Sequence, residues 1–317
     1  MCKLAVLLAY LAFGGHDRQV QATSQQLEGN VLAQSRKALA ALLLAFKCSA
    51  AFHPCHPGAR CSSCNPPLAD ASQSALDRVS SFRCRSPLMS DRPALTIDVT
   101  SDLACPWCYV GFKRLQNAID RSNVDINIRF HPYLIDPDTQ KQGEPYLDYN
   151  VRRWGGDGWV FGMKSSSLGD GCEFKKWGRQ NPQSVWAHTL QAHRLLWFVR
   201  EKAGWLGMSR MKAMLFEEYY EKGTNISMLD ELVAIGKRFL LECGEDLEST
   251  FAAEELEDFL RSPDAVGTKE VLQECMDAQM KGVSSVPNYR IEGVAQPVPG
   301  ALSSEDWQGI FKQLGVA

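Results

Sequence analysis

The chain has 317 residues, 45% of them hydrophobic, with eight Trp and eleven Cys, and this composition supports a sizeable folded core. Residues 1–88 carry nine basic and four acidic side chains, a net charge of +5, so the whole-chain charge of −3 leaves −8 for the remainder. An acidic body without a basic stripe excludes nucleic acid as the expected partner.

Residues 1–88 differ in composition from the rest, since they contain six of the eleven Cys and no Trp. Their two apolar runs, 4–13 and 38–46, are shorter than the roughly 20 residues that cross a bilayer, so no membrane span is expected. Residues 49–85 are rich in Ser, contain Arg and have few acidic residues, as organelle transit segments do.

We therefore predict a targeting or disordered leader over 1–88 and a folded domain over 89–317. A real leader would direct the protein to a plastid or mitochondrion. If translation instead starts at Met89, the protein is expected in the cytoplasm.

A CxxC motif, Cys105-Pro106-Trp107-Cys108, stands between a predicted strand and a predicted helix. Residues 95–100 alternate in polarity and include β-branched side chains, which favours a strand. The apolar residues Phe112, Leu115 and Ile119 recur at intervals of three and four, which predicts an amphipathic helix starting near Pro106. The motif therefore opens a helix.

The position of the two thiols predicts different roles for them. Unpaired N–H groups and the helix dipole favour an anion at a helix N-terminus, so Cys105 is expected to form a stabilised thiolate and act as the nucleophile. Cys108 lies one turn further along the same face and is expected to resolve a mixed disulfide. This arrangement indicates redox chemistry.

A CxxC motif is also half of a common structural zinc site. The second half would be Cys61 and Cys64, which have the same spacing but lie in the predicted leader. We expect no metal at the redox pair, and a zinc-stabilised interaction module remains the less favoured alternative.

The segments after the first predicted helix extend the pattern. Residues 124–131 alternate apolar and polar side chains, which predicts a second strand and a βαβ unit. From Ser184 to about Gly282 the pattern is helical, with no strand period. The predicted helical segments are 184–203, 209–223, 228–243, 247–261 and 265–281.

The last part of the chain predicts a hairpin and a helix. Residues 288–291 and 294–298 flank the turn pair Glu292-Gly293, and Ser303 is expected to cap a helix that ends at Leu314. The whole order predicts an α/β protein, a thioredoxin fold with a large helical domain inserted at about 138–265 between its βαβ and ββα halves.

Four segments in this order resemble the DsbA-like thioredoxin family, specifically its FrnE-type branch, over residues 94–314. That branch is related to kappa-class glutathione transferase and to 2-hydroxychromene-2-carboxylate isomerase. The segments are Asp102–Gly111 (DLACPWCYVG), His131–Pro137 (HPYLIDP), Thr189–Leu196 (TLQAHRLL) and Gly282–Tyr289 (GVSSVPNY).

The resemblance implies that Pro287 is a cis-proline facing the CxxC motif and that the backbone of Val286 pairs with an extended peptide or with glutathione. Pro106, Trp107, Val286 and Pro287 are therefore expected to contact substrate. His193, in the third segment, is expected to be a packed or hydrogen-bonded histidine without a catalytic role.

The predicted function is that of an enzyme, a thiol-disulfide oxidoreductase acting through Cys105 and Cys108 on thiol- or disulfide-containing proteins or small molecules, with isomerase activity as a further expectation. No resident cofactor is expected, and glutathione is a candidate co-substrate. The main alternative is a glutathione-dependent transferase or isomerase of the kappa or 2-hydroxychromene-2-carboxylate isomerase type, in which a serine usually stands in place of Cys105.

Overall fold

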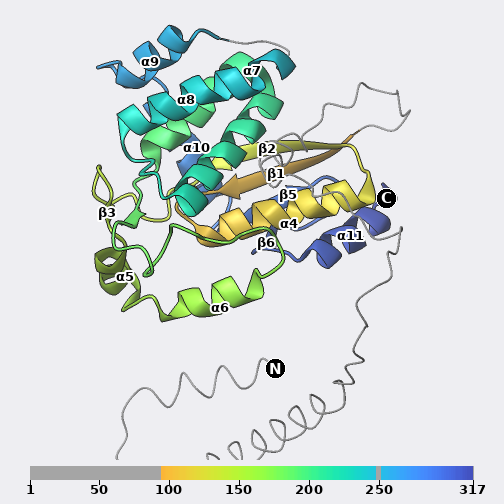
Figure 1. Ribbon diagram of the computed structural model, residues 1–317. Helices are drawn as coiled ribbons and strands as arrows, with labels where there is room; N and C mark the ends of the chain where they lie inside the picture. Colours follow the sequence, from red (N-terminus) through yellow and green to blue (C-terminus); the bar gives the residue numbers. More distant parts are fainter. Residues whose placement is uncertain (1–93, 248–250, 317) are drawn as a thin grey trace, which may run out of the picture. The chain divides into compact units, whose positions relative to one another are not determined.

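The computed structural model describes residues 94–247 and 251–316 (Figure 1). The predicted leader, and with it Cys61 and Cys64, lies outside the described residues. The main sheet has the strand order β2-β1-β5-β6. β1 (Leu95–Ser101) pairs in parallel with β2 (Ile126–Pro132) and antiparallel with β5 (Asn288–Ile291), which pairs antiparallel with β6 (Val298–Pro299).

Helices cover both faces of this sheet, as Figure 1 shows. Phe130 and His131 are neighbours on β2, so their side chains point to opposite faces. Phe130 meets Phe112 of α4 (Pro106–Ser122), with ring centroids 5.9 Å apart. His131 lies 3.8 Å from Glu274 of α10 (Thr268–Met280). The helix that carries the CxxC motif and α10 therefore lie on opposite faces.

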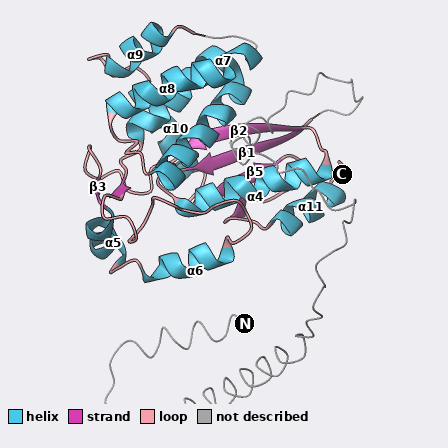
Figure 2. Cartoon of the chain, viewed as in Figure 1, coloured by secondary structure: helices cyan, strands magenta, loops and turns pink. Residues whose placement is uncertain are grey.

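Helices dominate the segment between β2 and α10 (Figure 2). They are α5 (Tyr146–Trp154), α6 (Gly158–Ser166), α7 (Leu190–Phe216), the π-helix η2 (Glu217–Lys222), α8 (Leu229–Cys243), the short 3₁₀ helix η3 (Gly244–Asp246) and α9 (Ala253–Arg261). The predicted fold class, a thioredoxin fold with a helical insertion, is confirmed. Among the helices of the described residues, none is long and apolar enough to cross a membrane.

The start of the first helix predicted in this part of the chain is wrong. The helix predicted from Ser184 begins at Leu190, because β4 (Val185–Trp186) pairs with β3 (Glu144–Pro145). The helix end predicted at Ala203 is confirmed: α7 consists of two helical stretches joined at a kink, where Ala203 and Gly204 leave helical geometry and Gly204 has φ 67°. A left-handed φ of this kind is readily adopted by glycine.

The end of the fold matches the predicted elements except at β6. Of the strand predicted over 294–298, only Val298 belongs to β6 (Val298–Pro299). Val294 closes a turn onto the carbonyl of Ile291 (3.0 Å), and Pro297 has no N–H to donate to a ladder. The predicted cap is confirmed: Ser303 and Asp306 form a reciprocal capping box at the start of α11 (Ser304–Gln313).

Candidate active site

Cys105 and Cys108 occupy the N-terminus of α4, as predicted. Cys105 is the N-cap residue and Pro106 follows at the first helical position, where its missing N–H leaves no bond unmade. The N–H groups of Cys108 and Tyr109 donate to the carbonyl of Cys105, at 3.0 and 3.3 Å. Both thiols are unbridged and buried, with 5% of Cys105 and 2% of Cys108 exposed.

The segment around Pro287 faces this helix end. The Cys105 thiol donates to the carbonyl of Val286 at 3.6 Å, and the Val286–Pro287 peptide bond is cis, which confirms the predicted conformation. Trp107 is partly buried and packs against the core. The structure therefore brings the predicted residues of the motif together with Val286 and Pro287.

Close packing between α4 and this segment requires a glycine at position 111. A Cβ on Gly111 would lie 2.4 Å from the hydroxyl of Tyr289 and 3.2 Å from Cγ of Pro287. Tyr289 is itself buried on β5. The absence of a side chain at Gly111 thus sets how closely Pro287 approaches the helix that carries the thiols.

The two thiols are electrostatically linked. Burial raises the pKa of the Cys108 thiol well above its usual range, and the hydrogen bond and charge of Cys105 raise it further. Cys108 is therefore a protonated thiol at neutral pH. A group that accepts its proton must act before Cys108 can attack a disulfide.

Asp102, in the loop between β1 and α4, is a buried carboxylate with several donors. Its Oδ1 accepts from the N–H of Ala104 at 3.1 Å and the hydroxyl of Thr189 at 2.7 Å, and its Oδ2 accepts from the N–H of Ile135 at 2.8 Å. Nε2 of His193 lies 3.4 Å from Oδ1. Burial raises the pKa of Asp102, but the interactions with His193 and the other donors outweigh it and leave the pKa lowered.

His193 is buried on α7 and contacts Asp102 rather than solvent. Burial lowers its pKa, and the hydrogen bond and charge of Asp102 only partly oppose this. The imidazole is therefore neutral at neutral pH. This matches the expectation of a packed, hydrogen-bonded histidine.

Lys212 of α7 is a buried residue near the thiols for which sequence reasoning gave no role. Only 1% of it is exposed, and its ammonium lies 5.0 Å from the ring centroid of Phe130 and 5.2 Å from that of Phe216. Burial lowers the pKa of Lys212 to about 8, although the nearby thiols and Asp102 oppose the shift. One feature of the sequence could have indicated that Lys212 is buried: it lies next to Met211 and three residues before Leu215, which are both apolar positions of a predicted helix.

The insertion also supports the loop before α4 through its π-helix. Tyr220 donates from its hydroxyl to the carbonyl of Leu103 at 3.1 Å. The ring of Tyr109, next to Cys108, stacks on Tyr220 at 5.0 Å, and its hydroxyl donates to Glu221 at 3.1 Å. Neither Tyr220 nor Glu221 was singled out from the sequence, because their contacts depend on where the insertion folds back.

A family model described as the DSBA-like thioredoxin domain matches residues 96–312. The chain belongs to this family. The match confirms the resemblance to the family, whose members are thiol oxidoreductases or isomerases. The FrnE-type branch stays a prediction. A search of curated protein sequences finds no significant match.

Solved structures resemble this DSBA-like domain at low sequence identity. A probable DsbA oxidoreductase from Streptomyces coelicolor aligns with TM-score 0.55 and 20% identity over 69% of this chain and 89% of that one. The cytosolic disulfide reductase DsbM from Pseudomonas aeruginosa aligns with TM-score 0.47 and 16% identity over 70% of this chain and 100% of that one. A 2-hydroxychromene-2-carboxylate isomerase aligns with TM-score 0.44 and 13% identity over 69% of this chain and 94% of that one. At 20% identity, the likeness to the Streptomyces coelicolor structure shows the fold and not the reaction.

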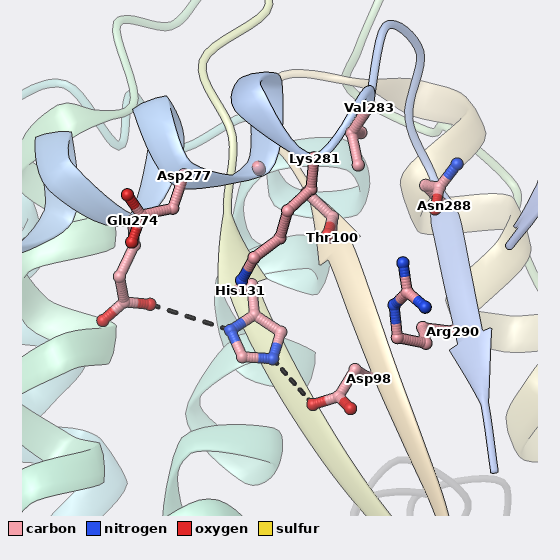
Figure 3. Close-up of a pocket in the computed structure, with 10 residues that line it drawn as sticks. Asp98, Thr100, His131, Glu274, Asp277, Lys281, Val283, Asn288 and Arg290 are labelled. Atoms are coloured by element: carbon pink, nitrogen blue, oxygen red, sulfur yellow. Dashed lines mark hydrogen bonds and ion pairs between the residues drawn. The ribbon is translucent and has the colours of Figure 1, made fainter.

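A cavity of about 210 Å³ lies elsewhere in the DSBA-like domain, on the α10 face of the sheet (Figure 3). Its lining includes Asp98, His131, Glu274 and Lys281, and none of the predicted site residues. Figure 3 shows the His131 ring between the two carboxylates, with Nε2 at 2.8 Å from Asp98 and Nδ1 at 3.8 Å from Glu274. Within the described residues, no group of three or more His, Cys, Asp or Glu side chains is arranged to hold a metal ion.

Proposed function

We propose that the protein is a thiol-disulfide oxidoreductase that works through Cys105 and Cys108. The observation that carries the proposal is the Cys105 thiol at the N-terminus of α4, 3.6 Å from the Val286 carbonyl, with Cys108 buried one turn behind it. A helix N-terminus stabilises a thiolate. The buried second thiol is placed to act only after Cys105 has reacted.

The proposed cycle has two exchange steps. The Cys105 thiolate attacks a substrate disulfide, forms a mixed disulfide and releases one substrate sulfur as a thiolate. Cys108 then attacks the Cys105 sulfur, which closes the Cys105–Cys108 disulfide and releases the second substrate thiol. The same steps in reverse oxidise a substrate dithiol, so isomerisation follows where both directions are accessible.

The substrate is proposed to lie over Val286 and Pro287, beside Trp107. Proline has no N–H, so an extended chain can approach the sulfur over Pro287 without meeting a donor. The partners proposed are proteins or small molecules that contain a thiol or a disulfide, with glutathione as a co-substrate. The exchange needs no resident cofactor or metal.

The test is the reduction potential of the Cys105–Cys108 pair in the full chain. The protein is equilibrated with glutathione buffers of graded poise and alkylated, and peptide mass spectrometry then assigns thiols to individual cysteines, because the chain has eleven. We expect one two-electron transition confined to Cys105 and Cys108. A potential above that of glutathione identifies a disulfide donor or isomerase and one well below it a reductase, whereas no transition at this pair contradicts the proposal.

A further inference from the structure

The cavity on the α10 face of the sheet has no part in the proposed redox cycle (Figure 3). The strands β1 and β5 contribute Thr100 and Asn288, which lie directly across from each other. Lys281, the C-cap residue of α10, lines one side, and Arg290 of β5 lines the other. At about 210 Å³ the cavity is smaller than the roughly 300–1,000 Å³ of pockets for drug-sized ligands, so it suits a small ligand.

The three carboxylates that line the cavity already have partners. Nε2 of His131 lies 2.8 Å from Asp98, and Nδ1 of the same ring lies 3.8 Å from Glu274. Glu274 also forms an ion pair with Arg200 at 2.9 Å. Asp277 accepts a hydrogen bond at 2.8 Å from a side-chain amide one turn earlier on α10. The negative charge of the lining is therefore engaged by groups of the protein itself.

Four other side chains of the lining carry hydrogen-bond donors. Lys281 and Arg290 are exposed cations, and Thr100 and Asn288 are partly buried. None of these four side chains forms a hydrogen bond or ion pair with another residue that the structure describes. Figure 3 shows Lys281 reaching from α10 over the cavity and Arg290 on the opposite side, over β5. The unused bonding capacity of the cavity is therefore that of donors, two of them positively charged.

Fixed positive charges beside the cavity also favour an anion. Asp98 stands in register with Arg129 of β2 on one side and with Arg290 on the other. Nε of Arg129 is buried and has no partner among the described residues. Four cationic side chains thus stand against the three carboxylates, namely those of Arg129, Arg200, Lys281 and Arg290. An excess of one sign of charge in a partly enclosed site attracts ligands of the opposite sign.

Two unpaired cations on opposite sides of the cavity match the charge of a phosphate group. A phosphate group carries a charge of about −1.5 to −2 near neutral pH and has three acceptor oxygens. Arginine and lysine both bind phosphate, arginine through two parallel N–H bonds and lysine as a point charge. The Thr100 hydroxyl and the Asn288 amide supply further donors. A carboxylate has a single charge, so it would leave one of the two cations unmatched.

We propose that this cavity binds a phosphate group, as the free ion or as part of a small phosphorylated molecule, between Lys281 and Arg290. Lys281 precedes and Arg290 follows the segment that carries Val286 and Pro287. A bound phosphate therefore bridges the two ends of the segment whose Val286 carbonyl accepts from Cys105. The site contains neither thiol and does not depend on the proposed redox cycle.

The experiment measures binding of inorganic phosphate to the full chain by isothermal titration calorimetry, at about pH 8 and constant ionic strength. Lys281→Met and Arg290→Met each remove one cation of the site. The matched controls are Lys269→Met, an exposed lysine of α10, and Arg121→Met, an exposed arginine at the end of α4. Neither control residue lines the cavity. The melting temperature of each variant without phosphate reports whether it is folded.

We expect the wild type and both controls to bind phosphate. Lys281→Met and Arg290→Met are each expected to bind it roughly 10-fold more weakly, the loss typical of one charge-assisted hydrogen bond. The melting temperature of the wild type should rise with phosphate concentration, because a ligand of the folded state stabilises that state. Sulfate, which is also a dianion, is expected to compete with phosphate, whereas acetate at the same concentration is not.

Glycerol 3-phosphate distinguishes the two sources of the phosphate group. Tighter binding than that of inorganic phosphate indicates a small phosphorylated molecule, and equal or weaker binding indicates the free ion. Either result supports the site, provided that it is weakened in Lys281→Met and Arg290→Met.

Phosphate binding that is unchanged in both of these variants would place the anion elsewhere on the chain, for example on the basic residues 1–88, and would overturn the proposal. A wild type that shows neither heat of binding nor a rise in melting temperature overturns it directly. Equal competition by acetate would show that a single negative charge suffices and would overturn the assignment to phosphate.

Discussion

The side chains of Cys105 and Cys108, three positions apart on one helix turn, have different neighbours. Cys105 is the N-cap residue and its thiol reaches the carbonyl of Val286. Cys108 lies inside the first turn, behind Cys105 and among buried aromatic residues. The first sulfur is placed for attack on a substrate and the second for attack on the first.

Substitution of each cysteine is expected to stop the cycle at a different stage. Cys105→Ser removes the nucleophile, so disulfide exchange is abolished. Cys108→Ser leaves the mixed disulfide without a resolving thiol, so covalent adducts of substrate on Cys105 accumulate. Intact-mass spectrometry after incubation with glutathione disulfide measures both results, and exchange that persists in Cys105→Ser would contradict the mechanism. Glutathione-dependent isomerisation that survives Cys108→Ser would instead favour the transferase or isomerase alternative.

Gly111→Ala tests how α4 packs on the segment that contains Pro287. The added methyl would lie 2.4 Å from the Tyr289 hydroxyl and 3.2 Å from Pro287 Cγ, and buried overpacking of this kind costs about 1–3 kcal/mol. Urea unfolding measures the loss of stability.

Gly309→Ala is the matched control, because a Cβ at that helical position of α11 meets nothing within 4 Å. This substitution is expected to be neutral or to stabilise the fold by about 0.5–1 kcal/mol. Equal stability changes in the two variants would show that the close approach does not constrain the fold.

At the scale of elements, His131 joins β2 to its neighbours on the α10 face. It contacts Asp98 of β1 at 2.8 Å and Glu274 of α10 at 3.8 Å. Burial lowers the pKa of His131, but hydrogen bonds and charges from the two carboxylates outweigh it and raise the pKa above 6.5. Glu274 shows the converse, since burial raises its pKa but His131 and Arg200 bring it below 4.5.

These shifts predict a pH window for stability. A raised histidine pKa contributes stability that is fully present below about 6.5 and is lost as pH rises through the raised value. A lowered glutamate pKa contributes stability that is present above about 4.5 and is lost as pH falls through the lowered value. Both contributions are therefore complete between about pH 4.5 and 6.5. We expect His131→Gln to lower the melting temperature most at pH 5.5–6.5 and progressively less toward pH 9, and a difference that stays constant over this range would contradict the assignment.

The elements that the sequence predicts well have local signals. β1 has alternating side chains, α4 has Pro106 at its first position and α11 has the Ser303–Asp306 pair. β4 could not be predicted, because its two residues are a strand only through pairing with Glu144–Pro145, about forty positions earlier. Pairing between distant segments is decided by tertiary packing, which local periodicity does not contain.

The same distinction holds for the candidate site. The thiols and the proline carry a motif, and the structure places them together. Asp102 belongs to the first of the four segments that resemble the family, but the resemblance implies no role for it. Lys212 appears in the sequence only as a lysine on a predicted helix. Their relation to the thiols depends on α7 folding back beside α4, which no residue near the motif encodes.

At the scale of the whole molecule, the helical insertion contributes to the surroundings of the redox pair. Thr189 precedes α7, His193 and Lys212 lie on it, and Tyr220 lies on the π-helix that continues it. Each contacts or interacts with the thiols or the loop that leads to them. The insertion and the thioredoxin-type sheet thus share one interior around the Asp102 carboxylate.

Asp102 is the residue through which this shared interior can be tested. Asp102→Ala removes the acceptor of two N–H groups and of the Thr189 hydroxyl, and buried donors left without a partner cost about 1–3 kcal/mol each. We expect a loss of about 3 kcal/mol in the free energy of unfolding, measured with urea at pH 7. Asp102→Asn keeps an acceptor oxygen and is expected to lose less stability, whereas Asp138→Ala, at an exposed position, should change stability by under about 0.5 kcal/mol.

The contribution of Asp102 to stability also depends on pH. Because the Asp102 pKa is lowered in the folded protein, this contribution is present above about pH 3.8 and is lost as pH falls through the lowered value. Loss of stability in Asp102→Ala no larger than in Asp138→Ala would mean that the two halves of the fold are held together elsewhere.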